Sequence, residues 1–226
     1  MHTKKPSIYS GDKGVKIFLS TILFSGLAYG FYRGIQDNYL AEIVKISEFE
    51  RGIVEFFREL PGLMLVFILA WMYRLSEAKV FKIGTAIMLC GVLGLFLLGS
   101  SKVVVILFMV VFSTGEHIVM PIKSSMSLSF AKSDKGGASL GVTSSISHGG
   151  NIIGYMLVSL LFVILARLGY QRDSLLGFRI VFLVAAILLL LSTMIALTMK
   201  DKGKQVKRSR LYFHKKFTKF YMLEIF

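Results

Sequence analysis

Six mainly apolar segments alternate with polar stretches along the chain. Each is close to the length of about 20 residues that one helical crossing of a bilayer needs. None shows the strict apolar–polar alternation of membrane β-strands. The pattern therefore predicts an all-α polytopic membrane protein with six transmembrane helices. The segments cover residues 15–40, 53–73, 83–100, 103–127, 136–166 and 180–199.

Polar side chains fall in four of the six segments, in an order that repeats after three. The first two segments carry them and the third carries no charge; the fourth and fifth carry them and the sixth carries no charge. A charged side chain facing lipid near the bilayer centre costs at least about 2.5–3.5 kcal/mol. We therefore expect segments one, two, four and five to face a shared wet interior, as a 3+3 repeat around a polar cavity typical of transporters. These residues are Arg33, Asp37, Glu55, Arg58, Glu59, Glu116, His117, Lys123, His148 and Asn151.

Composition excludes a soluble protein. Hydrophobic residues make up 54% of the 226, and charged residues only 18%, whereas a soluble domain carries about 25% charged residues. The single cysteine, Cys90, cannot form an internal disulfide. The chain has no phosphate-binding loop, no H-E-x-x-H and no C-x-x-C. We expect neither an enzyme nor a bound cofactor or metal.

The distribution of basic residues predicts the orientation. The 27 Lys and Arg against 13 Asp and Glu give +14, which in a soluble chain would indicate nucleic acid. With the N-terminus inside, the inner loops and both ends carry 18 of the 27 and the outer loops six. Because basic residues favour the cytoplasmic side, both termini are predicted to be cytoplasmic, with no nucleic-acid partner.

Three parts follow from this topology. Residues 1–14 form a cytoplasmic N-terminus, 15–199 the six-helix transmembrane bundle, and 200–226 a basic amphipathic cytoplasmic linker. Aromatic residues recur at helical spacing among the lysines of the linker, so we expect it to lie on anionic lipid of the inner leaflet. The predicted location is a bacterial plasma (inner) membrane.

The stretch between the second and third segments carries a family resemblance. The major facilitator superfamily has an approximate G-x-x-x-D-R-x-G-R-R signature there. Here Arg74 matches its arginine and Lys79 keeps a nearby positive charge, while Leu69 and Tyr73 replace its glycine and aspartate. Together with the repeat of polar segments, the chain resembles the N-terminal six-helix half of that superfamily.

The resemblance implies a fold, a partner and gating residues. Segments one, two, four and five would line a central cavity, with three and six outside. Arg74 and Lys79 would be gating residues. A complete transporter has two such halves, so a missing C-terminal half or a second six-span chain is the expected partner.

The first segment contains two kinds of candidate residue. Gly26, Gly30 and Gly34 form a stripe of small residues, which favours close helix packing. Arg33 and Asp37 share a neighbouring face. They either neutralise one another, or Arg33 anchors an anionic substrate and Asp37 responds to a proton or cation.

The fourth and fifth segments contain the remaining candidates. Glu116 and Lys123 share a face with His117 alongside, so Glu116 and His117 could exchange protons. The alternative is a structural ion pair from Glu116 to Lys123 or to Arg33. His148 and Asn151 contact either substrate or a neighbouring helix.

The sequence thus predicts a secondary transporter that moves a small solute by alternating access, coupled to protons or another ion. The alternative from another class is a non-transporting membrane scaffold or receptor-like assembly partner. In that case the interior charges would be fully paired and closed to water.

Overall fold

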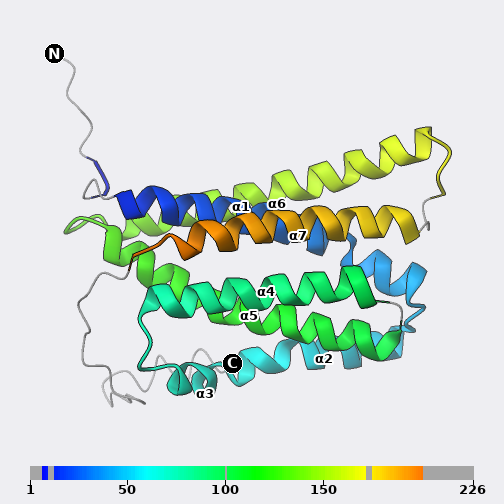
Figure 1. The fold of residues 1–226 in the computed structure, drawn as a ribbon, viewed down its shortest axis with the longest axis horizontal. Helices are drawn as coiled ribbons and strands as arrows, with labels where there is room; N and C mark the ends of the chain where they lie inside the picture. Colours follow the sequence, from blue (N-terminus) through cyan, green and yellow to red (C-terminus); the bar gives the residue numbers. More distant parts are fainter. Residues whose placement is uncertain (1–6, 10–12, 100, 172–174, 201–226) are drawn as a thin grey trace.

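The computed structural model describes residues 7–9, 13–99, 101–171 and 175–200, and within these ranges the chain is helical and contains no strand (Figure 1). The first helix continues directly into a short π-helix, and six further helices follow. They are α1 (Lys13–Asn38), η1 (Tyr39–Ile43), α2 (Glu48–Leu63), α3 (Leu65–Trp71), α4 (Glu77–Leu98), α5 (Lys102–Phe130), α6 (Gly136–Arg167) and α7 (Leu175–Leu197).

Five helices in the described part of the chain are long and apolar enough to cross a membrane. They are α1 with η1, α4, α5, α6 and α7. The all-α class and the membrane-length helices agree with the prediction from sequence. The predicted basic linker, from residue 201 onward, lies outside the described residues, as do residues 1–6 of the predicted N-terminal part.

The predicted second crossing differs, because it is divided into α2 and α3. The break falls at Met64, two residues after Gly62. Proline lacks a backbone N–H and its ring crowds the preceding turn, so Pro61 weakens the last turns of α2 before the break. Neither α2 nor α3 alone is a membrane-length helix by size and composition.

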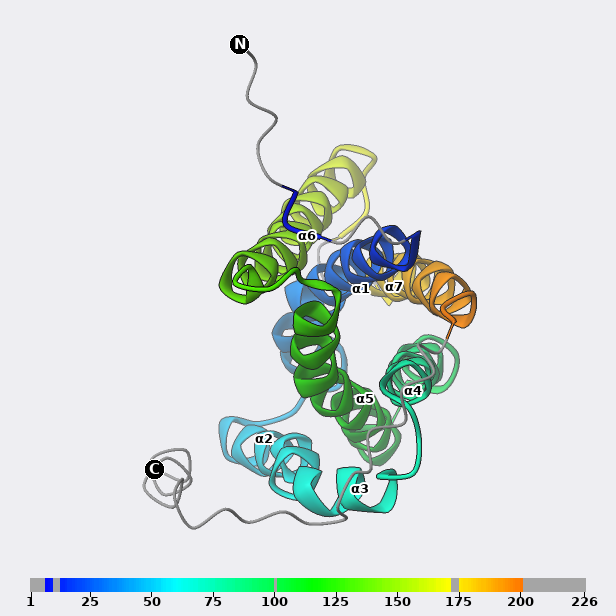
Figure 2. The same ribbon diagram turned by 90° about the vertical axis from the view of Figure 1, so that its left-hand side faces the viewer.

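Helices α1 and α5 each pack between two other helices. In the end-on view of Figure 2, α1 lies between α6 and α7, and α5 lies between α2 and α4; α4 and α7 also pack on each other. Aromatic rings fill the core of this arrangement. Phe18 of α1 packs on Phe81 of α4 and on Phe130 of α5, and Tyr39 packs on Phe182 of α7.

Glycine makes the closest approach possible, between α1 and α6. A Cβ atom at Gly26 would lie 2.6 Å from the Ser147 carbonyl oxygen, and one at Gly30 would lie 2.9 Å from the Gly154 Cα. Gly34 completes the stripe, facing Tyr155. The two backbones therefore touch along this stripe, which no larger residue allows.

Contacts at the two ends of the bundle show that successive long helices run in opposite directions. At one end Tyr9, before α1, bridges to Ala131 after α5, and the Lys82 ammonium donates to the Met199 carbonyl at 2.7 Å. At the other end Lys102 of α5 pairs with Glu50 of α2 at 2.7 Å. The end of α7 is thereby fixed against the start of α4.

Candidate functional site

Ionisable side chains gather where α2 packs on α5. Arg58 of α2 forms ion pairs with Glu55 at 2.7 Å and with Glu59 at 2.5 Å, and its side chain is only 12% exposed. The hydroxyl of Ser113 on α5 donates to the Arg58 carbonyl oxygen at 2.5 Å. A charged group held by two carboxylates thus lies directly against α5.

His117 of α5 joins this group. Its Nδ1 lies 2.9 Å from the Ser113 carbonyl oxygen, and its Nε2 lies 3.4 Å from Oε2 of Glu59. The ring occupies the space left by Gly62, because a Cβ atom there would lie 2.6 Å from Nε2. The printed sequence places Glu116 next to His117, but the structure makes Glu59 the carboxylate that His117 pairs with.

Glu116 is part-buried between α5, α1 and α2. It interacts with the hydroxyl of Tyr29, and Arg33 and Arg58 are its neighbouring cations. The hydroxyl of Tyr32 is buried in the same region and has no hydrogen-bond partner among the described residues. Glu116 forms no ion pair in the described part of the chain, so the expected pairs with Lys123 and Arg33 are absent there.

Lys123 and Asn151 connect α6 to its neighbours. The Lys123 ammonium donates to the Ser147 hydroxyl at 3.2 Å. In the orientation that satisfies its amide, the Asn151 nitrogen donates to the carbonyls of Ser147 at 2.9 Å and Gly26 at 2.8 Å. The bond to Gly26 joins α6 to α1, which was one of the two expected roles of Asn151, whereas Ser147 lies on α6 itself and His148 is exposed there.

Arg33 and Asp37 do not pair with each other. Arg33 donates to the Gln36 side-chain oxygen at 2.8 Å, and Asp37 pairs with Arg51 at 2.6 Å in an exposed ion pair. The expected mutual neutralisation is therefore wrong, because α1 and the start of α2 approach each other and supply a second arginine. Arg33 stays near Glu116, and Asp37 lies at the surface.

The two predicted gating residues lie around the turn between α3 and α4. The guanidinium of Arg74 lies 5.5 Å from the centre of the Tyr73 ring and donates to its hydroxyl at 2.9 Å. Lys79 is exposed in the first turn of α4, where its backbone N–H donates to the Ser76 hydroxyl. Tyr73 thus offers Arg74 an aromatic face and a hydroxyl acceptor.

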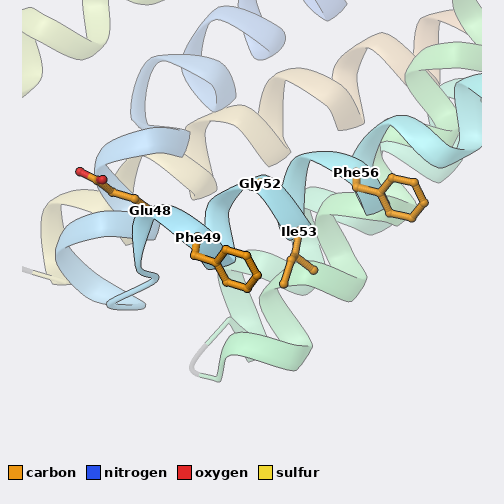
Figure 3. A pocket seen from close by; sticks show the side chains of 5 residues that line it. All are labelled: Glu48, Phe49, Gly52, Ile53 and Phe56. Carbon is orange, nitrogen blue, oxygen red and sulfur yellow. The ribbon is translucent and has the colours of Figure 1, made fainter.

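Surface hollows lie apart from these charged groups. One of about 420 Å³ lies on the outer face of α2, where Glu48, Phe49, Gly52, Ile53 and Phe56 line it (Figure 3). It is built by one helix, and three of its five lining residues are large and apolar, with Glu48 at its edge. A second, of about 330 Å³, lies between α1 and α6 and is lined only by apolar residues, glycines and two serines.

Comparison with protein-family models and with curated proteins finds no match. Within the described ranges, no group of three or more His, Cys, Asp or Glu side chains is placed to hold a metal ion. The site is therefore interpreted from its own geometry. Its ionisable and hydrogen-bonding members come from α1, α2, α5 and α6: Tyr29, Tyr32, Arg33, Glu55, Arg58, Glu59, Glu116, His117, Lys123 and Ser147, here called the polar cluster.

Sequence reasoning did not find Tyr29, Tyr32 and Ser147 of the polar cluster. Glu55, Arg58 and Glu59 were expected to face the shared interior, but their contact with α5 was not predicted. Gly62 was not among the expected site residues. The one sequence signal for its role is that a glycine follows Glu59 by three residues and so lies near it on the helix surface.

Proposed function

We propose that this chain is the N-terminal six-helix half of a secondary transporter of the major facilitator type, moving a small solute by alternating access with proton coupling. The observation that carries the proposal is the polar cluster itself. Its residues come from α1, α2, α5 and α6, while α4 has no charged residue between 83 and 98 and α7 has none between 180 and 197. Charged groups are expensive in a bilayer, and such groups mark solute or ion pathways.

In this proposal α2 and α3 together form the second crossing. From Glu48 to Trp71 they contain 24 residues, or about 36 Å of helix at about 1.5 Å per residue. The hydrocarbon core is about 30 Å thick, so the first turn of α2 can stand outside it. Broken helices are tolerated in transporters where they face a polar cavity.

The pattern of helix packing supports a 3+3 repeat. If crossings one, two and three correspond to four, five and six, then the α1–α6 contact corresponds to the α5–α2 contact. The α1–α7 contact likewise corresponds to α5–α4, and the α4–α7 contact corresponds to itself. These five contacts are present, whereas the weaker α5–α6 contact has no α1–α2 counterpart of similar extent.

Orientation belongs to the same proposal. The start of α1, the α3–α4 turn, the α5–α6 turn and the end of α7 lie at one end of the bundle. This end carries the lysines of the predicted inner loops, including Lys82, Lys132 and Lys135. We therefore propose that it is cytoplasmic, in a bacterial plasma membrane rich in anionic lipid.

Two buried polar groups, one in the polar cluster and one next to it on α1, lack a protein partner in the described part of the chain. The hydroxyl of Tyr32 and the amide nitrogen of Gln36 are buried with no partner among the described residues. Buried polar groups normally have a partner, which includes water and bound solute. Together with Arg33, Lys123 and the carboxylate of Glu116, they offer hydrogen bonds and both signs of charge to a small polar or zwitterionic molecule.

A transporter of this kind needs two six-helix halves that rock about the site. We propose that a C-terminal half or a second six-span chain completes the cavity opposite the polar cluster. A purified six-span monomer that transports solute alone would contradict this part of the proposal.

The rival function is a scaffold whose charges are paired and sealed. Proteoliposomes with the pH dye pyranine inside distinguish the two, using a panel of sugars, amino acids, organic anions and cationic amphiphiles. With the chain reconstituted together with the half or second copy that completes it, we expect one class to change the internal pH, and Glu116→Gln and His117→Ala to lose this change. Glu48→Gln, an exposed control outside the polar cluster, should keep it.

If no panel member moved protons or exchanged across the liposome membrane, the transporter proposal would be wrong. If transport occurred and both substitutions left it unchanged, the coupling role of the polar cluster would be wrong instead.

A further inference from the structure

The most constrained titratable group of the polar cluster is the imidazole of His117, and hydrogen bonding fixes which of its nitrogens can take up a proton. Nδ1 lies 2.9 Å from the Ser113 carbonyl oxygen, which can only accept. The Ser113 hydroxyl, 3.1 Å away, already donates its hydrogen to the Arg58 carbonyl. Nδ1 must therefore carry a hydrogen, and Nε2 is the nitrogen that binds or releases the titrating proton.

Nε2 faces a carboxylate. It lies 3.4 Å from Oε2 of Glu59, and with a lone pair on Nε2 and a carboxylate opposite, both atoms would be acceptors. One proton between them converts this repulsion into an ion pair. Because Arg58 already pairs with Oε1 of Glu59 at 2.5 Å, we place the proton of the His117–Glu59 pair on Nε2 of His117.

The charge balance next to His117 favours the same proton. Glu55 and Glu59 share the single cation Arg58, so this group has a net charge of −1 when all three are ionised. A proton on Nε2 makes the group neutral. A neutral group is cheaper than a charged one in a low-dielectric surrounding.

The other elements around His117 leave this balance in place. On its own helix Glu116 is the adjacent charge, and from α1 Tyr29 and Arg33 face Glu116. The residues of α3 include none that is ionisable, and α4 has no charge between 83 and 98. From α6, the Ser147 hydroxyl accepts a hydrogen bond from Lys123 of α5.

Gly62 leaves the space that the imidazole of His117 occupies. A Cβ atom there would lie 2.6 Å from Nε2 and 2.7 Å from Cδ2 of His117, so any larger residue would push the ring away from Glu59. Gly52, ten residues earlier in α2, would meet nothing within 4 Å. The two glycines are a matched pair on one helix.

We propose that His117 and Glu59 form the proton-binding site of this protein, with Gly62 as the residue that positions the imidazole. The bound proton forms a bond to Nε2 of His117 and is held by the carboxylate of Glu59; when it leaves to water, the lone pair returns to Nε2. The use of this proton in transport rests on the proposed function, whereas the binding itself does not.

The test is nuclear magnetic resonance of the full chain in lipid nanodiscs, with isotope-labelled histidine. His117 is identified by the signal that disappears in His117→Gln, and the exposed His148 is an internal reference in each spectrum. We expect the neutral form of His117 to be the Nδ1–H tautomer. At a fixed pH, Glu59→Gln should lower the ratio of protonated to neutral His117 severalfold, with His148 unchanged.

Gly62→Ala provides a second, independent variant should Glu59→Gln fail to fold. It should lower the same ratio by severalfold, while Gly52→Ala leaves it unchanged. Glu59→Asp should give an intermediate ratio, which a purely structural role of Glu59 would not produce. An Nε2–H neutral tautomer, or a ratio unchanged in both Glu59→Gln and Gly62→Ala, would overturn the proposal.

Transport is scored separately, with the pyranine assay. If His117 behaves as expected and no solute moves, the proton site stands and the transporter proposal fails. If a solute drives proton movement but Glu59→Gln leaves the ratio of protonated to neutral His117 unchanged, the transporter proposal is supported and the His117–Glu59 proposal is wrong.

Discussion

The contact between α1 and α6 and the contact between α2 and α5 occupy corresponding places around α1 and α5, but their chemistry is opposite. Between α1 and α6, Gly26, Gly30 and Gly154 bring the backbones together. Between α2 and α5, Arg58 and His117 meet through ion pairs and hydrogen bonds. Close backbone packing does not depend on protonation, whereas the strength of a charged contact changes when one of its groups gains or loses a proton.

This difference assigns different parts to the two contacts. A glycine contact tolerates no added atom and does not respond to pH, so it holds α1 and α6 as one unit. The charged contact, next to the break at Met64, is the place where a proton can alter how α2 sits on α5. The following expected outcomes test that division, from the largest effect to the smallest.

Gly30→Leu should destabilise the protein most. Its side chain would enter the space of Gly154, whose Cα lies 2.9 Å from the position of a Cβ atom at Gly30. We expect a loss of about 3 kcal/mol from overpacking, measured as the thermal midpoint of monodisperse protein in detergent. The control is Gly149→Leu on α6, where a Cβ atom meets nothing within 4 Å. An equal loss of stability there would show that the close contact at Gly30 is not what stabilises the protein.

Arg58→Leu should come second, with a loss of about 2 kcal/mol, because it leaves Glu55 and Glu59 without their cation. Adding Glu55→Gln and Glu59→Gln should recover part of this loss. Arg51→Leu, which breaks only the exposed pair with Asp37, should cost less than about 1 kcal/mol. Arg58→Leu with no greater effect than Arg51→Leu would mean that the charged contact is not structural.

Asn151→Ala should cost about 1 kcal/mol, since it removes hydrogen bonds to the carbonyls of Gly26 and Ser147. The loss should not vary with pH between 5 and 8, unlike that of Glu59→Gln. Thermal midpoints of both variants across this range make the measurement. A pH-dependent loss in Asn151→Ala would erase the distinction between the two contacts.

The smallest effect is expected at the outer end of the α2–α5 contact. Hydrogen bonds from Lys102, and then from the Ser47 backbone, lower the pKa of Glu50 to about 2, from 4.5. Because the folded-state pKa is depressed, this contact stabilises fully above about pH 4.5, and the contribution disappears as the pH falls towards 2.

Thermal midpoints of wild type and Glu50→Gln at low salt measure this contribution. The two should differ slightly at pH 6 and converge as the pH falls below about 4. A gap that widened on acidification would contradict the assigned direction. Glu48→Gln, in the same first turn of α2, controls for a general loss of charge.

The sequence was sufficient for the helices but not for the partners. The uncharged runs at 83–100 and 180–199 predict α4 and α7, because an apolar run of that length has few alternatives in a chain of this composition. Pro61 and Gly62 are the signal in the sequence for the break at Met64. Its consequence, two helices in place of one, depends on packing against α5.

The spacing of charged residues in the sequence could not predict which of them form ion pairs. Asp37 has Arg33 one helical turn before it and still pairs with Arg51, and His117 pairs with Glu59 although Glu116 adjoins it. Which carboxylate meets which cation depends on how each helix is rotated and how deeply it packs. Those quantities come from tertiary structure and leave no local pattern.

The central claim is that the polar cluster faces a path open to water, and cysteine accessibility tests it most directly. In a Cys90→Ser background, single cysteines replace Ser124 and Met120, exposed on α5, and His148, exposed on α6; Leu183 and Leu190, exposed on α7, are the controls. The account predicts that a membrane-impermeant thiol reagent labels the α5 and α6 positions and not the α7 positions. No labelling at any α5 or α6 position, from either side of the membrane, would contradict it.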